Sequence, residues 1–327
     1  MSTPDAGFAL ALAELALAEL SRAYGDLVAG FVGDAALGDL AREQGLEAAL
    51  TAPHLDALRK QNRELVTRAD ERAERTMRDL VAREFPDHGI AGEEYGFHEG
   101  GPWLWVFDPV DGTSVLVRTA LAAAYGLPAP QAGFGVLVGL LHGDAAVLGV
   151  LAELEPAHAG TLTYAHRWVG EAGSLTLVDG TPAAAPEQKP LAEAVLACTV
   201  PEVMFGDAPG FAALRARVAA VNTDLNCVGY VRLLGGGVQI VVERDLTLPD
   251  VAALLPVLDG AGVTVTDHSG RPVRFDATAR DGEYALLAAE AQLHAEALAM
   301  LGPAELGPPG AHPERTTHLG YVAKFGG

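Results

Sequence analysis

The stretch from Trp103 to Ser114, WLWVFDPVDGTS, constrains the fold more than any other part of the chain. It opens with a run of large apolar side chains, which is typical of a buried strand. Asp108 and Asp111 follow at once. Two carboxylates at the end of a buried strand repel each other and resist the loss of their water. A fold that keeps both groups there needs a positive charge between them.

The length and composition of the chain predict a protein with a large core. Its 327 residues exceed the usual size of one hydrophobic core, so we expect two packed domains, 1–186 and 187–327. The boundary falls in the Pro- and Ala-rich segment 181–190. We expect an antiparallel sheet and most of the metal ligands in the first domain. Strands alternate with helices in the second, which indicates an α/β architecture.

The net charge of −21 narrows the classes of partner. Acidic residues outnumber basic ones 43 to 22, so the surface repels nucleic acid and anionic membranes, and we expect neither as a partner. Cys198 and Cys227 are too few for a disulfide framework and fit a reducing compartment. We find no signal peptide and no apolar run long enough to cross a bilayer, so the sequence predicts a cytoplasmic protein.

Periodic apolar residues predict two helices before the buried strand. One spans residues 6–24 and the other residues 70–85, and we expect short helices and loops in the segment 26–62 between them. After the buried strand we expect two strand pairs, which turn at residues 143–144 and 179–180.

The DPVDGTS motif favours a site for a hard divalent cation beside a phosphate group. Mg²⁺ prefers carboxylate and carbonyl oxygens. Because Pro109 forces the strand to turn, Asp108, Asp111 and the Val110 carbonyl can face one point. A cation there would supply the positive charge that the two aspartates need. Residues 112–114 then enter a predicted helix, whose N-terminal N–H groups bind anions.

Two more acidic positions are candidates for the same site. Glu93 and Glu94 lie between glycines in GEEYG, and Asp250 lies near the start of a predicted helix, where the helix dipole favours a carboxylate. Each position has a simpler interpretation: a solvated loop for the glutamates and a helix cap for Asp250.

Together these motifs are similar to those of the inositol monophosphatase superfamily, a group of Mg²⁺-dependent, lithium-sensitive phosphatases. The resemblance spans residues 64–275 and rests on four motifs in this order: VTRAD, GEEYG, DPVDGTS and PDVAALLPVLDGAG. Other segments resemble the bacterial histidinol-phosphate phosphatase branch, namely HRWVGEAG, ACTVPEVMF, NCVGYVRLLGGGVQIVVE and ALLPVLDGAG.

The resemblance implies a layered α/β/α/β/α sandwich and a homodimer. It implies that two or three Mg²⁺ ions are held by Glu93, Asp108, the Val110 carbonyl, Asp111 and Asp250. It assigns activation of the attacking water to Asp70 and Thr113, and phosphate binding to the amides of Gly112 and Thr113. Glu243 matches a position that contacts the organic part of the substrate. Asn226 aligns with an aspartate of the branch pattern that would contact a cationic substrate amine.

The implied function is that of a Mg²⁺-dependent phosphomonoesterase. Its substrate would be a small metabolite, histidinol phosphate or inositol monophosphate, attacked by a metal-activated water without a covalent intermediate. One alternative is a nucleotide or sugar-bisphosphate phosphatase of the same superfamily. The other is a metal-binding interaction protein that has lost turnover.

Four departures from the family pattern concern the substrate and leave the metal ligands intact. They are Pro249 in place of an aromatic residue, Asn226 in place of an aspartate, the long segment 26–62, and the long apolar segment 115–133.

Three of the candidate residues also have structural interpretations. Asp70 could begin a helix, Asn226 could form hydrogen bonds at a strand end, and Glu243 could pair with Arg244. The run Gly235–Gly237 is more typical of a turn or bulge than of a nucleotide loop, because it lacks the G-x-G-x-x-G spacing.

Overall fold

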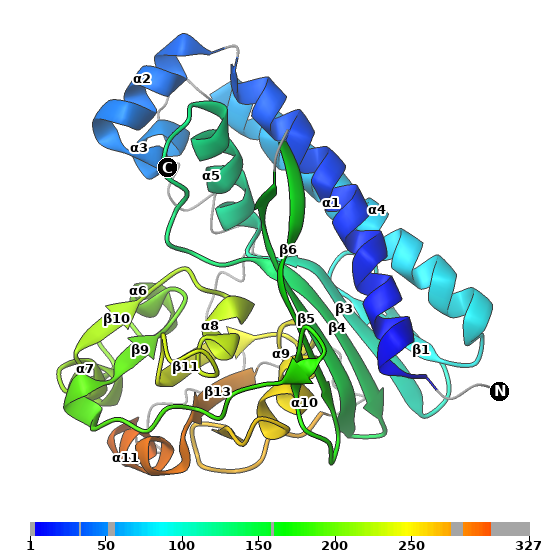
Figure 1. The fold of residues 1–327 in the computed structure, drawn as a ribbon, viewed down its shortest axis with the longest axis vertical. Coiled ribbons are helices and arrows are strands. Elements are labelled where there is room, and N and C mark those ends of the chain that lie inside the picture. The colour runs from blue at the N-terminus through cyan, green and yellow to red at the C-terminus, as the bar shows by residue number, and fades with distance from the viewer. Residues whose placement is uncertain (1–3, 33, 52–55, 158–159, 276–283, 302–327) are drawn as a thin grey trace.

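The computed structural model describes residues 4–32, 34–51, 56–157, 160–275 and 284–301. Helices and sheets alternate in layers (Figure 1), so the expected layered α/β fold is confirmed. The helices are α1 (Ala6–Val32), α2 (Ala35–Gln44), α3 (Leu46–Thr51), α4 (Asp56–Glu84), α5 (Thr113–Ala124), α6 (Pro201–Met204), α7 (Pro209–Arg215), α8 (Cys227–Val231), α9 (Leu248–Ala252), α10 (Leu254–Asp259) and α11 (Ala291–Leu301).

Within the described residues the strands form two sheets. The first has the order β2-β1-β3-β4-β5-β6-β7-β8, and the second has the order β10-β9-β11-β13-β12. The strands are β1 (Gly89–Gly92), β2 (Gly96–His98), β3 (Trp103–Asp111), β4 (Gly135–His142), β5 (Ala145–Ala157), β6 (Thr161–Glu171), β7 (Leu177–Val178), β8 (Thr181–Pro182), β9 (Val195–Ala197), β10 (Ala220–Asn222), β11 (Ile240–Leu246), β12 (Thr264–Thr266) and β13 (Tyr284–Ala289).

Three apolar clusters hold the layers together. In the first, α1, α4 and α5 cover one face of the first sheet, with α1 and α4 running side by side (Figure 1). In the second, α8, α9 and α10 lie between the two sheets. In the third, α7 and α11 cover the outer face of the second sheet. Burial of these three interfaces is the main force that joins the layers.

The first part of strand β3, from Trp103 to Phe107, is apolar because helices cover both faces of the strand. Trp105 and Phe107 belong to the cluster under α1 and α4, whereas Leu104 and Val106 belong to the cluster between the sheets. This alternation is the two-residue period of a strand. The expectation of a buried strand is therefore confirmed, and the structure adds that both of its faces are covered.

The two strand turns expected from the sequence are also confirmed. β4 ends at His142 and β5 begins at Ala145. β7 and β8 pair across Asp179 and Gly180, which both have positive φ, as a two-residue hairpin turn requires. The expected domain boundary lies between β8 and β9, and the division into separate domains stays a prediction.

The N-terminal helices are longer than the sequence indicates. The helix expected to end at residue 24 continues through Gly25, because Leu27 and Phe31 extend its buried face. A Cβ at Gly25 would lie only 3.0 Å from the Gly160 carbonyl oxygen, so this glycine serves close packing rather than helix termination. The helix expected over 70–85 starts at Asp56. Its first turns are rich in charged helix formers without an apolar stripe, so periodicity misses them.

The two long segments that depart from the family pattern, 26–62 and 115–133, pack against each other. Helices α2 and α3 belong to the first segment and α5 to the second, and α3 contacts α5. The Tyr125 hydroxyl donates a hydrogen bond to the Asp34 carbonyl at 2.5 Å. Arg118 on α5 lies 3.8 Å from the carboxylate of Glu47. The two extensions are therefore packed together, with α3 beside α5.

The contact between β5 and the α9–α10 junction needs a glycine, which gives a test of the layered packing. A Cβ on Gly149 would lie 1.9 Å from the Ala253 carbonyl oxygen. We expect Gly149→Ala to lower the free energy of unfolding by about 1–3 kcal/mol. Urea denaturation measures this.

Gly30→Ala is the matched control, because a Cβ at Gly30 meets nothing within 4 Å. Alanine favours helix over glycine, so this change should raise the free energy of unfolding by up to about 1 kcal/mol. Equal effects of the two substitutions would contradict the close packing of β5 under α9 and α10.

Candidate active site

An irregularity in β3 brings Asp108 and Asp111 to the same side of the sheet. In a regular strand, side chains three residues apart point to opposite faces. Here the pairing with β4 shifts by one residue, from Asp108–Leu137 to Asp111–Gly135. A shift of this kind re-aims the side chains that follow it. The strand therefore turns at Pro109 as the sequence predicts, and both carboxylates face the second half of the chain.

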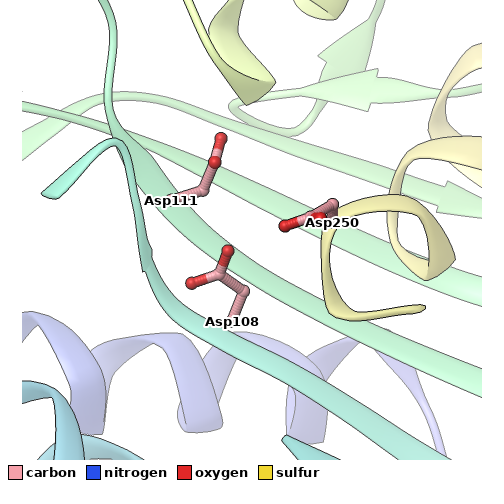
Figure 2. Close-up of side chains that lie close together, drawn as sticks. All are labelled: Asp108, Asp111 and Asp250. Carbon is pink, nitrogen blue, oxygen red and sulfur yellow. The ribbon is translucent and has the colours of Figure 1, made fainter. Parts of the chain in front are cut away.

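Asp250 completes a carboxylate cluster with these two residues. It lies on α9, which packs against β3 and β4. One carboxylate oxygen from each of Asp108, Asp111 and Asp250 lies within 4.8 Å of the other two. Figure 2 shows the three side chains pointing into one shared space. Three carboxylates at this spacing match the oxygen donors that a hard divalent cation binds.

Hydrogen bonds fix the orientation of two of these carboxylates. Asp111 Oδ2 accepts a hydrogen bond from the Cys227 amide at the start of α8. Asp250 Oδ2 accepts from the amide of Thr247 at 2.6 Å, which is one half of a capping box, and from the Thr247 hydroxyl at 2.8 Å. The helix-cap interpretation of Asp250 is thus correct for one oxygen, and it is compatible with a ligand role for the other.

Asp108 is the residue that most needs a cation. It is fully buried, its Oδ1 accepts a hydrogen bond from the Val110 amide at 3.0 Å, and its Oδ2 has no hydrogen-bond partner among the described residues. Burial raises the pKa of Asp108 well above its ordinary value, and four neighbouring carboxylates raise it further: Glu93, Asp111, Asp250 and Asp70. A buried carboxylate oxygen that has no hydrogen-bond partner and lies among other carboxylates is a suitable ligand for a divalent cation.

Glu93 lies near this cluster but is not one of its three closest members. It is exposed in the turn between β1 and β2. β1 runs parallel to β3 with Gly92 beside Phe107, so the residue after β1 emerges next to Asp108. Accordingly, the charge of Glu93 has the largest effect of the four carboxylates on the pKa of Asp108.

Asp70 and Thr113 lie on two different helices, α4 and α5. Asp70 is buried within α4 rather than at its start, and its charge also raises the pKa of Asp108. Thr113 begins α5, and its hydroxyl donates to the Val110 carbonyl at 3.2 Å. A carbonyl has two lone pairs, so Val110 keeps one for a further partner.

Gly112 allows the helix α5 to begin directly beside the carboxylates. Its φ of 97° is in the left-handed region, and a Cβ there would lie 2.8 Å from the Gly133 carbonyl oxygen. The expected loop that enters a helix at residues 112–114 is therefore confirmed. The first N–H groups of α5 have no acceptor inside the helix, so this end suits a phosphate.

A pocket of about 310 Å³, part of it open to solvent, adjoins the cluster. It is lined by Asp111, Thr199, Met204, Asn226, Cys227, Tyr230, Glu243, Leu246, Asp250 and Leu254. Carboxylate, hydroxyl and apolar groups therefore share its wall. None of these described lining residues is Lys, Arg or His.

Glu243 is buried in the wall of this pocket. Its Oε1 accepts hydrogen bonds from the amide of Thr199, at 3.0 Å, and from the Thr199 hydroxyl. Burial raises the pKa of Glu243 to about 7, although the hydrogen bonds from Thr199 oppose the rise. Its neighbour Arg244 forms an ion pair with Asp245 at 3.3 Å. The structure therefore directs Glu243 to the pocket.

Asn226 lines the same pocket, and its side chain is hydrogen-bonded to the backbone of other residues. Its Nδ2 donates to the Gly133 carbonyl at 2.8 Å and to the Asp224 carbonyl at 3.3 Å. Its φ of 50° is unusual for a residue with a side chain. An aspartate here would direct negative charge at two carbonyl oxygens. The need for a hydrogen-bond donor therefore explains why this position holds asparagine. The amide of the next residue, Cys227, is the one that binds Asp111.

Sequence reasoning did not single out Thr199, Tyr230 or Glu74. The first two line the pocket, and their only signal was their place in the segments ACTVPEVMF and NCVGYV. Glu74 is buried one helical turn after Asp70 and accepts hydrogen bonds from the turn that carries Glu93. Its signal was the i,i+4 spacing from Asp70.

Comparison with known proteins identifies the family of this chain. The sequence model of the inositol monophosphatase family matches residues 31–301. The chain belongs to the inositol monophosphatase family. The resemblance inferred from the four motifs is therefore confirmed.

Individual members of the inositol monophosphatase family are similar over much of this chain. The bifunctional phosphatase IMPL2 of Arabidopsis thaliana is 30% identical over 227 residues, which are 68% of this chain but only 60% of that relative. A histidinol-phosphatase of Chlorobaculum parvum is 28% identical over 64% of this chain and 75% of the relative.

Among solved structures, an inositol monophosphatase from Zymomonas mobilis is 26% identical, with a TM-score of 0.61. The match covers 88% of this chain and 96% of that one. Separately, none of the described helices of this family member has the length and apolar character needed to span a membrane.

The electrostatic penalty at Asp108 predicts the behaviour of Asp108→Asn without metal. Asparagine carries no charge and keeps the hydrogen bond from Val110 through its amide oxygen. We expect the variant to raise the Tm in EDTA at pH 8 by about 2–5 °C. We also expect Mg²⁺ to raise the Tm of the wild type but not that of the variant. Differential scanning calorimetry measures both effects.

The exposed Asp207→Asn is the control for loss of one negative charge, and should leave both Tm values close to those of the wild type. An Asp108→Asn protein that is less stable in EDTA and still stabilised by Mg²⁺ would contradict the account of the cluster.

The raised pKa of Glu243 predicts a pH-dependent stability. The carboxyl ionises near pH 7 in the folded protein and near pH 4.5 in the unfolded chain. Between these values the folded state binds the additional proton, so the free energy of unfolding falls as the pH rises. We compare the free energies of unfolding at pH 4.5 and at pH 7, both in EDTA. The decrease over this range should be roughly 3 kcal/mol smaller for Glu243→Gln than for the wild type. Urea denaturation across this range provides the comparison; parallel curves for the two proteins would refute it.

Proposed function

We propose that this protein is a Mg²⁺-dependent phosphomonoesterase that acts on a small metabolite. The observation that carries the proposal is the pocket beside the carboxylate cluster, whose described lining includes three acidic side chains and no Lys, Arg or His. A phosphate group entering such a pocket meets like charge, so it needs a cation to bind. Family membership and the relatives named as phosphatases support a phosphoric monoester hydrolase.

The cation would be held mainly by Asp108, Asp111 and Asp250. Glu93 and the Val110 carbonyl are the remaining ligands that we propose, for a total of two or three ions. When bound, Mg²⁺ supplies positive charge that offsets the phosphate oxygens and favours the ionisation of water.

The chain's own residues bind and orient the reactants. We assign the phosphate to the N-terminal amides of α5, at Gly112 and Thr113, where the helix dipole and the free N–H groups favour an anion. We assign Asp70 and the Thr113 hydroxyl to orient the attacking water, with Asp70 accepting its proton. Both residues lie near Asp108. The charge of Asp70 raises the pKa of Asp108, and the Thr113 hydroxyl donates a hydrogen bond to the carbonyl of Val110, two residues after Asp108.

The wall of the pocket favours a substrate with a cationic or hydroxyl-bearing organic part. Glu243 and Asp111 offer carboxyl groups, and Met204, Leu246 and Leu254 offer apolar surface. An imidazole- and amine-bearing ester such as histidinol phosphate matches both kinds of surface, and inositol monophosphate matches the polar one. A bisphosphate substrate is less suited, because no described lining residue is a cation that could bind its second phosphate.

A substrate panel tests this function. Purified protein with Mg²⁺ is given histidinol phosphate, inositol 1-phosphate, a 3′,5′-bisphosphonucleotide and fructose 1,6-bisphosphate, and released phosphate is measured. We expect the two monoesters to react fastest and EDTA to abolish release. Asp111→Asn should lower kcat at least about 100-fold, whereas the exposed Asp207→Asn should not change it.

Binding of Mg²⁺ without phosphate release from any ester would instead favour a metal-binding interaction protein that has lost turnover. Faster release from the bisphosphates would favour the nucleotide or sugar-bisphosphate alternative. The homodimeric state and the cytoplasmic location implied by the sequence analysis stay predictions.

A further inference from the structure

The turn that carries Glu93 is held by a buried carboxylate on a different element. Glu74 on α4 is completely buried. Its Oε2 accepts a hydrogen bond from the Glu94 amide at 2.7 Å, and its Oε1 accepts one from the Tyr95 amide at 3.2 Å. Hydrogen bonds from backbone amides to a buried carboxylate are charge-assisted and hence strong. The two residues that follow Glu93 are thus bonded to α4.

Glu74 also fixes the backbone just before Glu93. An added Cβ on Gly92 would lie 2.2 Å from Glu74 Oε1 and 2.6 Å from Oε2. The carboxylate therefore packs directly on the Gly92 backbone, in space that any other residue would fill. Glu93 lies between this contact and the two hydrogen bonds, so its position depends on Glu74 from both sides.

Arg78 holds Glu74 in place and extends the contact to the far end of the turn. Its Nε lies 2.6 Å from Glu74 Oε1, and its guanidinium also donates to the Gly96 carbonyl. A second arginine, Arg75, donates a hydrogen bond to the Tyr95 hydroxyl at 2.7 Å. A guanidinium can make such paired contacts because its donors have a fixed geometry.

Helix α4 therefore links two parts of the site. Asp70 is the residue that we propose accepts the proton of the attacking water. Glu74 follows it by four residues, so the two side chains share one face of the helix, about 6 Å apart along its axis. Loss of Glu74 would leave Asp70 in place and release the turn that carries Glu93.

We propose that Glu74, supported by Arg78, is a positioning residue that holds the 93–95 turn so that Glu93 can bind the cation at the Asp108 cluster. The inference rests on the assignment of Glu93 as a ligand under the proposed function. Residues that orient metal ligands typically change metal affinity by about 10–100-fold when they are replaced. Glu74 acts through Glu93 and touches neither the metal nor the substrate.

The test is a double-mutant cycle on metal binding, which needs no substrate. Binding of Mn²⁺ to the full chain is measured by the loss of the free-ion EPR signal for the wild type, Glu74→Ala, Glu93→Gln and the double variant. We expect each single change to weaken Mn²⁺ binding about 10–100-fold. The double variant should bind no more weakly than Glu93→Gln alone, because Glu74 acts only through Glu93. Additive losses would overturn the proposal.

Amide hydrogen exchange of the peptide covering residues 93–96 separates positioning from binding. We expect Glu74→Ala to accelerate exchange, since two amides lose their acceptor, whereas Glu93→Gln should leave exchange slow. Unchanged exchange in Glu74→Ala would also overturn the proposal. Glu71→Gln is the matched control: it lies on the same helix and acts on the turn through its charge, and it should change Mn²⁺ affinity less than threefold.

If Glu74→Ala fails to fold, Glu74→Gln and Gly92→Ala replace it. Glutamine keeps one acceptor and should show a smaller loss, and Gly92→Ala should displace Glu74 and reproduce the full loss. Because Mn²⁺ binding needs no substrate, a wild type that binds Mn²⁺ but releases no phosphate would refute the proposed function and leave this cycle valid. A wild type that binds no Mn²⁺ would refute both.

Discussion

The mutual repulsion of buried carboxylates is the constraint on which the rest of the structure depends. Asp108 is fully buried beside Asp111 and Asp250, and burial together with its neighbours raises its pKa well above the ordinary value. Apolar packing must offset this penalty whenever no cation is present. The three clusters between and around the two sheets supply that packing, and they therefore make a charged site possible at their centre.

Three local features of the backbone bring the carboxylates together. A one-residue shift in β3 turns Asp111 to the side of Asp108, the amide of Cys227 holds Asp111, and a capping box holds Asp250. Two of these three features come from the second half of the chain. The site is thus complete only when both sheets are packed together, and its geometry reports on the whole fold.

Much of this site could be predicted from the sequence, because the signals were local. The run WLWVFDPVDGTS predicted a buried strand, a turn and a helix start, and the structure has β3, Gly112 and α5 in these places. The extent of α1 and the start of α4 could not be predicted. Gly25 resembled a helix end but serves a close contact with Gly160, and the first turns of α4 have no apolar stripe. The roles of Glu74 and Thr199 depend on contacts between residues distant in the sequence, which no local pattern contains.

The central claim is that the three aspartates hold a divalent cation, and anomalous diffraction tests it most directly. Crystals soaked with Mn²⁺ and measured near the manganese absorption edge locate the ion without any assumption about activity. The account predicts a peak about 2 Å from carboxylate oxygens of Asp108, Asp111 and Asp250. An ion bound elsewhere, with no peak among these three side chains, would contradict it.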